Sequence, residues 1–272
     1  MNVLSLFDGI SAGQVALERA GIKVDNYYAS EIDKYAIQVT MKNYPNTIQV
    51  GDVVSLDTSK LPKIDLLCGG SPCQSFSIIG DGSGFDGKSG LFYEYIRVLK
   101  ETNPTYFLLE NVKMKKEWEN VISNLLGVKP IEINSNLVSA QNRKRLYWTN
   151  IPNIEIPEDK GILLKDIVSY DREWKELGKW VYSKWGEKSK LDNLKLLKSE
   201  KSNCLTTSKT HPRNYYLNDE KNKYSKLNSI EAEKLQTFSV DYTLGISEGR
   251  RFHALGNSWT VDVIAHIFKN LQ

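Results

Sequence analysis

Residues 64–74 of the chain read Ile64-Asp65-Leu66-Leu67-Cys68-Gly69-Gly70-Ser71-Pro72-Cys73-Gln74. The first five residues form a short apolar run that is typical of a buried strand in a parallel sheet. The two glycines suit a sharp turn at the carboxyl end of that strand, which is the end where open α/β sheets bind their ligands. Pro72 then stiffens the backbone before Cys73, so this thiol is a candidate nucleophile. The alternative is an inert core cysteine.

The length and composition predict one large domain, or a large domain with a small partner. The chain has 272 residues, of which 40% are hydrophobic, and this is enough to build a full core. No stretch approaches the ~18 consecutive apolar residues of a membrane span. The first seven residues are typical of a core strand rather than of a signal peptide, so we expect a cytoplasmic protein without a membrane partner.

The sequence contains three cysteines and three histidines, the residues that most often bind zinc. Cys68, Cys73 and Cys204 show no CxxC spacing, which argues against both a disulfide framework and a zinc site. We therefore predict no metal.

Positive charge is concentrated in one part of the chain. Residues 160–226 contain 16 Lys and Arg against 9 Asp and Glu, a balance of +7, so the remainder carries −4 of the total of +3. A basic segment joined to a mildly acidic domain suggests one face for a polyanion. A solvated lysine-rich surface is the alternative.

The amino-terminal residues have the order of a Rossmann-like βαβ unit. Residues 2–7 predict a strand, residues 8–13 a turn, and residues 14–20 a helix that Gly21 ends. Only Gly9 and Gly13 occupy glycine positions of the turn, so the GxGxxG motif of dinucleotide-binding proteins is missing. This argues against a nicotinamide oxidoreductase.

Two acidic residues follow the next two predicted strands. Residues 27–30 lead to Glu31, which lies 22 residues after Gly9, and an acid at that place binds the ribose hydroxyls of nucleoside cofactors. Residues 47–50 lead to Asp52, whose carboxylate could accept a hydrogen bond from an adenine amino group. The set forms an adenosine site without a pyrophosphate cradle, which favours S-adenosylmethionine over NAD or FAD.

Two further polar motifs end predicted strands. Residues 106–109 are apolar and lead to Glu110, which could donate a proton to a bound substrate or, alternatively, cap a helix starting near residue 113. A strand around residues 132–138 leads to Arg143 and Arg145. Arginines at alternate positions of an extended segment point the same way, toward one anionic target, unless they lie on an exposed basic strand.

The composition changes from about residue 151. Pro152 and Pro157 mark a linker, and the basic residues that follow are interleaved with aromatic ones, among them Trp174, Trp180, Trp185, Tyr215 and Tyr216. This mixture suits contact with the backbone and bases of DNA, although a small folded domain needs such a core as well. A helix over residues 230–236 and another over residues 260–271 are predicted to close the chain.

Taken in order, these motifs resemble the C5-cytosine-specific DNA methyltransferase family, of the bacterial and phage type, from residue 4 to about residue 271. Phe7-Asp8-Gly9 with Gly13 corresponds to the cofactor turn, Pro72-Cys73-Gln74 to the nucleophile motif and Glu110-Asn111-Val112 to the acid motif. Gln141, Arg143 and Arg145 match the QxRxR motif, and Gly256-Asn257-Ser258 matches the segment that closes the cofactor site. Details such as Ser258-Trp259-Thr260-Val261 are most similar to the de novo methyltransferase branch of animals.

The resemblance implies an α/β, Rossmann-like S-adenosylmethionine-dependent methyltransferase fold, with a mixed, mostly parallel sheet and helices on both faces. Residues 1–150 and 249–272 would form the catalytic and cofactor-binding domain, and residues 151–248 a small target-recognition domain. The cofactor would be S-adenosylmethionine, with S-adenosylhomocysteine as product. The residues expected to bind it are Phe7, Asp8, Gly9, Ile10, Ser11, Ala12, Glu31, Ile32, Asp52, Val53, Pro72, Asn257, Ser258 and Trp259.

The resemblance also implies the reaction, which is methylation of C5 of a cytosine flipped out of duplex DNA. Cys73 would add to C6 while Glu110 protonates or hydrogen-bonds N3, and C5 would then accept the methyl group. Loss of the C5 proton and release of Cys73 restore the ring. Arg145 would hold the cytosine O2 or a neighbouring phosphate, and Arg143 would position the Cys73 loop.

The residues expected to contact DNA come from three regions. Ile79 would insert as an apolar wedge beside the flipped base, unless it packs against the small domain. The full set is Gln74, Ser75, Ile79, Gln141, Thr206, Thr207, Lys209 and Arg213.

Two other functions share these motifs. One is methylation of transfer RNA, but the Cys-Phe-Thr signature of that branch is missing from the sequence; the other is a catalytically silent DNA-binding relative, but the nucleophile, acid and cofactor turn are all present. The excess of lysine (28 against 8 arginines) suggests an AT-rich bacterial or phage genome. For a DNA methyltransferase of a bacterial or phage-infected cell, the resemblance implies a nucleoid-associated protein. A second copy of the chain and a cognate restriction endonuclease are the protein partners considered.

Overall fold

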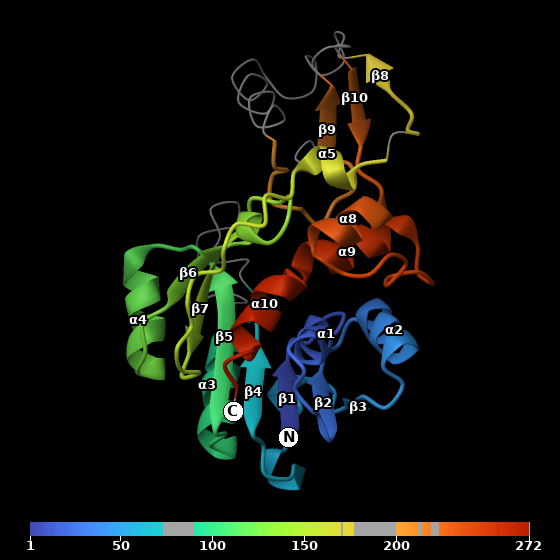
Figure 1. The fold of residues 1–272 in the computed structure, drawn as a ribbon. Helices are drawn as coiled ribbons and strands as arrows, with labels where there is room; N and C mark the ends of the chain where they lie inside the picture. Colours follow the sequence, from blue (N-terminus) through green and yellow to red (C-terminus); the bar gives the residue numbers. More distant parts are fainter. Residues whose placement is uncertain (73–89, 170, 177–199, 212–213, 219–222, 272) are drawn as a thin grey trace. The chain divides into compact units, whose positions relative to one another are not determined.

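A computed structural model describes residues 1–72, 90–169, 171–176, 200–211, 214–218 and 223–271. The chain divides into two compact units (Figure 1). The first unit comprises Met1–Asn134, Lys144–Ile156 and Val263–Gln272, and the second comprises Ser135–Arg143 and Pro157–Asp262. This division differs from the predicted one, because residues 135–143 and 249–262 belong to the second unit and residues 151–156 to the first. The predicted functional domains, 1–150 with 249–272 and 151–248, stay a prediction.

The first unit is built on a seven-stranded sheet of order β3-β2-β1-β4-β5-β7-β6 (Figure 1). The strands β1 to β5 pair in parallel, whereas β7 pairs antiparallel with β5 and β6. This confirms the predicted mixed, mostly parallel sheet. The strands are β1 (Asn2–Leu6), β2 (Asn26–Ser30), β3 (Ile48–Gln49), β4 (Leu66–Gly69), β5 (Tyr106–Val112), β6 (Ile131–Asn134) and β7 (Lys144–Thr149).

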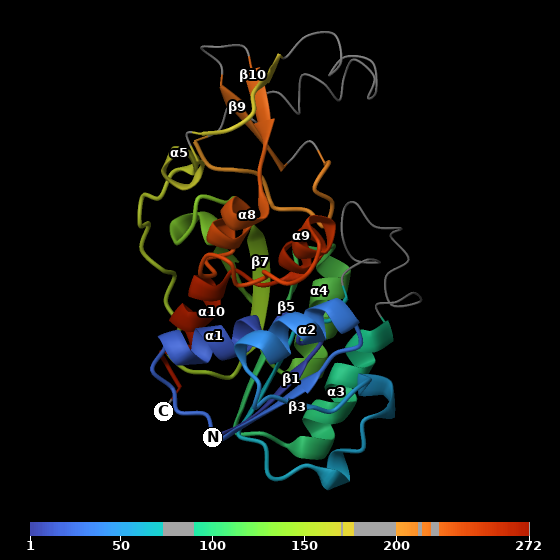
Figure 2. The same cartoon turned by 90° about the vertical axis from the view of Figure 1, so that its right-hand side faces the viewer.

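Helices cover both faces of this sheet, with α1 on one side and α3 on the other (Figure 2). The helices are α1 (Ala12–Arg19), α2 (Lys34–Asn43), α3 (Leu91–Thr102), α4 (Lys116–Leu126) and α10 (Val261–Phe268). The sequence did not predict α2, and it suggested α4 only as a helix starting near residue 113 that Glu110 could cap. For α2 the signal was available, because Asp33 caps the helix by accepting from the Tyr35 and Ala36 amides. None of the helices among the described residues is long and apolar enough to cross a membrane.

Two strands differ in length from the prediction. The strand predicted around residues 132–138 ends at Asn134, because Ser135–Leu137 form a short 3-10 turn, η5. By contrast, β5 continues to Val112 and so includes Glu110. Glu110 therefore lies within β5, where the pairing with β7 determines its neighbours, and not on a loop.

The core of the first unit lies beneath α3. Leu4 and Leu6 of β1 and Leu67 of β4 pack in one cluster with Tyr95 of α3 and Trp148 of β7, all essentially inaccessible to solvent. Alternate residues of a strand face the same side, which explains why Leu4 and Leu6 share this cluster. Burial of these side chains is the main stabilising contribution to the sheet.

The second unit contains a small antiparallel sheet of order β8-β10-β9 and three helices among its described residues. The elements are α5 (Leu164–Ile167), β8 (Lys175–Glu176), β9 (Tyr215–Asn218), β10 (Lys223–Lys226), α8 (Ser229–Leu235) and α9 (Glu248–Asn257). A buried ion pair of 2.8 Å between Arg251 of α9 and Glu233 of α8 joins these two helices. Glu233 also accepts from the amides of Asp241 and Thr243, so the buried charge is fully paired.

The assignment of the core predicts that substitution of two isoleucines of the first unit by alanine lowers the free energy of unfolding by different amounts. Ile64 is fully buried, whereas Ile48 on the edge strand β3 is 40% exposed. Ile64→Ala is expected to lower the free energy of unfolding by about 2–5 kcal/mol, because it leaves a cavity, and Ile48→Ala by less than about 1 kcal/mol. Urea denaturation of both variants measures the difference. Equal losses would contradict the assignment of the core.

Candidate active site

The turn after β1 has an unusual backbone. Phe7, Gly9 and Ser11 all have φ between 56° and 60°, in the left-handed region. Two of these are not glycines, and such conformations persist only where surrounding contacts hold them. The Asp8 amide donates to the Ser30 carbonyl of β2 at 3.1 Å, which is one such contact. Strained backbone is common at ligand sites, so the backbone geometry of this turn is typical of such a site.

Asp8 is the centre of a hydrogen-bond network under that turn. Its carboxylate accepts from the Ser11 hydroxyl at 2.5 Å and from the Tyr27 hydroxyl at 2.8 Å. Burial raises the pKa of Asp8 from 3.8 to about 6, although hydrogen bonds from Ser11, Ser5 and Tyr27 oppose the shift. Through these hydrogen bonds Asp8 stabilises the conformation of the turn. Ile10 and Ala12 are buried as well, and their contact with a cofactor stays a prediction.

Glu31 joins the turn after β1 to the end of β2. Its carboxylate accepts from the Gly9 amide at 2.7 Å, and its other oxygen accepts from the amides of Ile32 and Asp33, both at 2.8 Å. Three backbone donors fix the orientation of this acid. The structure thus brings together two of the segments predicted to bind the cofactor. The side chain of Ile32 beside them is 74% exposed.

Asp52 occupies the corresponding place after β3. Its side chain caps η1 (Val53–Ser55) by accepting from the Val54 amide at 3.0 Å. The Val53 side chain, predicted to flank the adenine, is buried in the core cluster, whereas Val54 is 58% exposed. The contact of Val53 with a cofactor stays a prediction.

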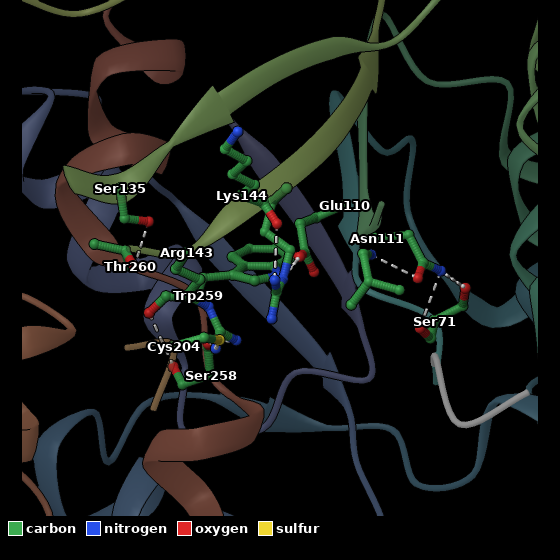
Figure 3. A network of polar contacts seen from close by, with 12 residues as sticks. Ser71, Glu110, Asn111, Ser135, Arg143, Lys144, Cys204, Ser258, Trp259 and Thr260 are labelled. Carbon is green, nitrogen blue, oxygen red and sulfur yellow. Dashed lines mark hydrogen bonds and ion pairs between the residues drawn. The ribbon is translucent and has the colours of Figure 1, made fainter. Parts of the chain in front are cut away.

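The turn after β4 is packed and braced. A Cβ atom added to Gly69 would lie 2.8 Å from the Leu6 carbonyl oxygen, so only glycine lets β4 end so close to β1. Asn111 of β5 donates from its buried side-chain amide to the Ser71 hydroxyl at 3.1 Å (Figure 3). Pro72 follows directly and is the last described residue of the turn. Asn111 therefore fixes the position of Ser71, which lies two residues before Cys73 in the sequence.

Glu110 and Arg145 form an ion pair at the same end of the sheet. Arg145 Nε lies 2.8 Å from Glu110 Oε1, and the two side chains are 14% and 12% exposed. In the β5–β7 ladder Val112 pairs with Arg145, so Glu110 and Arg145 are diagonal neighbours on one face. The alternative role for Glu110 as a helix cap is wrong, because α4 begins at Lys116 after Lys115 as its N-cap residue.

Gln141 and Arg143 lie in the second unit and are both buried. Arg143 donates to the carbonyls of Gly256 and Ser258 and to the Cys204 sulfur (Figure 3). The Gln141 side chain is fully inaccessible and accepts from the Leu205 amide at 2.7 Å. The structure thus assigns Gln141 an internal bond and gives no support for a DNA contact, since base contact requires exposed atoms. The sequence could not distinguish a contact with DNA from an internal hydrogen bond, because a side-chain amide serves both roles.

Thr206, Thr207 and Lys209 lie on a single loop of the second unit. Thr206 is partly buried and bonded to Asn214, Thr207 is exposed, and Lys209 forms an ion pair of 3.5 Å with Glu248 of α9. Asn257 is exposed at the end of α9, Ser258 is buried and Trp259 is partly buried. The roles of these residues toward DNA or cofactor stay predictions.

Several predicted residues lie outside the described ranges. They are Cys73, Gln74, Ser75, Ile79, Arg213, Trp180 and Trp185. Within the described ranges, no group of three or more His, Cys, Asp or Glu side chains could hold a metal ion.

The fold of the chain is that of known methyltransferases. It superposes on the Entamoeba histolytica methyltransferase EhMeth with a TM-score of 0.75 at 19% identity, covering 100% of this chain and 97% of that one. For the S. pombe Dnmt2 methyltransferase the TM-score is 0.67 at 20% identity, covering 98% and 96%. The likeness confirms the predicted Rossmann-like methyltransferase fold.

Sequence comparison gives the family. The chain matches the family of C-5 cytosine-specific DNA methylases over residues 1–171 and 132–272. It is 34% identical over 280 residues to the orphan methyltransferase M.Rho11sI of Bacillus phage rho11s, covering 96% of this chain and 53% of that protein. It is 30% identical over 310 residues to the type II methyltransferase M1.ScrFI of Lactococcus lactis subsp. cremoris, covering 99% and 77%. The chain belongs to the C-5 cytosine-specific DNA methylase family.

The raised pKa of Asp8 predicts a pH dependence of stability. Between about pH 4 and pH 6 the folded protein keeps a proton that the unfolded chain has released, so the Asp8 contribution to stability falls as the pH rises. Asp8→Asn removes this dependence. The free energy of unfolding of the wild type, relative to Asp8→Asn, is therefore expected to be lower at about pH 7.5 than at about pH 4.5, as measured by urea denaturation.

Asp57 provides the matched control, since a hydrogen bond from the Ser59 side chain lowers the pKa of this exposed group. Asp57→Asn should show no such fall over the same range. A constant difference between wild type and Asp8→Asn would contradict the burial of a protonated Asp8.

Proposed function

We propose that this chain is a DNA (cytosine-5-)-methyltransferase that transfers the methyl group of S-adenosylmethionine to a flipped-out cytosine of duplex DNA. The observation that supports this most is the Glu110–Arg145 ion pair at the carboxyl end of β5, in a chain of this family. A carboxyl group held beside a guanidinium at the edge of a parallel sheet can meet a base that is inserted there. The chain spans about half or less of the two phage relatives M.Rho11sI and M.SPRI.

The first unit has features that fit S-adenosylmethionine. Glu31 is oriented by three backbone amides and stands beside Ile32, whose apolar side chain is 74% exposed. Asp52 stands beside Val54, which is 58% exposed. Carboxylates for hydroxyl and amino groups next to exposed apolar side chains suit an adenosine group. When bound, the cofactor supplies the methyl group.

The protein's own residues would prepare the cytosine for that methyl group. Addition of the Cys73 thiolate to C6 places electrons on N3, where Glu110 in its protonated, neutral form donates a proton or a hydrogen bond, so that the carboxylate takes over the developing negative charge beside Arg145. Arg145 keeps Glu110 in place and would hold the cytosine O2. Asn111 holds Ser71 and thereby the backbone that leads to Cys73.

The proposed partners follow from the same reading. Duplex DNA is the proposed substrate, with Ile79, Thr206, Thr207 and Lys209 among the contacts still to be tested. A restriction endonuclease partner is suggested by the type II relatives, and self-association, a cytoplasmic location and association with the nucleoid stay predictions.

The direct test is mass spectrometry of nucleosides from unmethylated duplex DNA incubated with the pure protein and S-adenosylmethionine. We expect 5-methylcytosine with the wild type and none with Cys73→Ala, since the thiolate starts the reaction. Bisulfite sequencing of the product then gives the recognition sequence. Methylation of transfer RNA instead of DNA would favour the rival branch, and no methylation of either, with DNA binding retained, would make the chain a silent relative.

The role of Glu110 has its own prediction. Glu110→Gln keeps the size of the side chain but removes the acid, so kcat is expected to fall by roughly 10²–10⁴-fold. Glu132→Gln on strand β6 of the same sheet is the matched control, because Glu132 pairs with Lys113 on the surface. Single-turnover methylation assays of both variants measure the effect. If Glu110→Gln methylates DNA at the wild-type rate, Glu110 is not the acid of the reaction.

A further inference from the structure

Two segments of the second unit that are predicted to bind different ligands are in direct contact. The first is residues 204–208, called here the recognition loop because it contains Thr206 and Thr207, which are predicted to contact DNA. The second is residues 256–259, called here the closing segment because Asn257, Ser258 and Trp259 are predicted to bind the cofactor. Both lie wholly within the second unit.

Gly256 is the point of closest approach. A Cβ atom placed on Gly256 would lie 2.6 Å from the carbonyl carbon of Thr206, 2.6 Å from the amide nitrogen of Thr207 and 2.7 Å from the Thr206 carbonyl oxygen. All three are backbone atoms, which cannot rotate away as the end of a side chain can. The last turn of α9 therefore packs against the Thr206–Thr207 peptide with no spare room.

Arg143 forms a second link between the two segments. It donates to the Gly256 carbonyl at 3.2 Å and to the Ser258 carbonyl at 2.8 Å, both in the closing segment. Its other terminal nitrogen contacts the Cys204 sulfur of the recognition loop at 3.2 Å (Figure 3). A single planar guanidinium with a fixed geometry of donors thus spans both segments.

Two glutamines form a third link. The Leu205 amide donates to Gln141 at 2.7 Å, and Gln141 in turn donates to the Gln236 side chain at 3.2 Å. Gln236 donates to the carbonyls of Leu255 and Ser258 at 2.7 Å and 3.2 Å. Both glutamine side chains are fully buried. A shift of one segment would therefore leave buried polar groups unpaired in the other, which is costly.

The recognition loop is itself braced so that a shift moves it as a whole. The fully buried Asn214 accepts from the Thr206 amide at 3.1 Å and donates to the Ser208 carbonyl at 2.9 Å. These bonds tie the two ends of the exposed Thr207–Ser208 peptide to one side chain. A displacement of Thr206 cannot be absorbed within the loop.

We propose that Gly256 is a positioning residue that couples the two binding events: occupation of the closing segment by S-adenosylmethionine or its product orders the recognition loop, and DNA contact at the loop orders the closing segment. Such coupling is reciprocal by thermodynamic necessity. The inference rests on the proposed function, because it takes from it the ligand of each segment. It adds that cofactor and DNA bind cooperatively through this contact.

Hydrogen–deuterium exchange tests the coupling without any reaction. S-adenosylhomocysteine, at saturating concentration, is added to the full chain in the absence of DNA. In the wild type, amide exchange is expected to slow in residues 204–208 as well as in residues 256–259. In Gly256→Ala the protection of residues 204–208 is expected to be lost, because the added methyl group pushes the two segments apart.

Gly249→Ala is the matched control. Gly249 lies on the same helix, and a Cβ atom there would meet nothing within 4 Å, so this variant should show the wild-type pattern. Protection confined to residues 256–259 in the wild type, or retained in residues 204–208 of Gly256→Ala, would overturn the proposal. If Gly256→Ala does not fold, the presence or absence of protection in residues 204–208 of the wild type still tests the proposal. Failure of S-adenosylhomocysteine to bind the wild type would instead overturn the proposed function.

Calorimetry supplies the reciprocal measurement. The affinity for S-adenosylhomocysteine is measured with and without a duplex that carries the sequence methylated by the wild type. We expect DNA to raise this affinity by at least about fivefold in the wild type and in Gly249→Ala, and to leave it unchanged in Gly256→Ala. Equal effects of DNA on all three proteins would contradict the coupling.

Discussion

The register of the antiparallel β5–β7 ladder determines where the reactive groups of the first unit lie. Val112 pairs with Arg145, which places Arg145 diagonally beside Glu110 on one face of the sheet and allows the 2.8 Å ion pair. A slip of one residue would turn Arg145 to the opposite face. Leu146 and Trp148 on the opposite face of β7 are buried, and so is Tyr147 on the face of Arg145, so β7 is packed on both sides. The core thus positions the acid and its partner.

The other parts of the first-unit site are likewise held by backbone rather than by long side chains. Glu31 is oriented by the amides of Gly9, Ile32 and Asp33, and Asn111 braces the Ser71 turn. The Glu31–Gly9 and Asn111–Ser71 contacts each join the carboxyl end of one strand to that of its neighbour. A parallel sheet brings such ends to one edge, and so residues far apart in sequence meet there. The second unit uses buried polar links instead, through Arg143, Gln141 and Gln236.

Much of this arrangement was predictable from the sequence, because strand ends and glycine turns have strong local signals. The strands before Glu31, Cys73 and Glu110 and the mixed sheet were predicted correctly. The internal role of Gln141 was not, since an amide that binds DNA and an amide that bonds a buried loop look alike in sequence. Gly256 was predicted only as part of a motif: its contact with Thr206 joins residues 50 positions apart, and such close approaches are fixed by tertiary packing alone.

The central claim is that Cys73 adds to C6 of cytosine, and a covalent trap tests it most directly. Duplex DNA made with 5-fluorocytosine in place of cytosine blocks the last step, because the fluorine on C5 cannot leave as the proton does. Incubation with the protein and S-adenosylmethionine, followed by digestion and peptide mass spectrometry, is predicted to find methylated fluorocytosine attached to the peptide that contains Cys73. No adduct, or an adduct on the peptide of Cys68 or Cys204, would contradict the account.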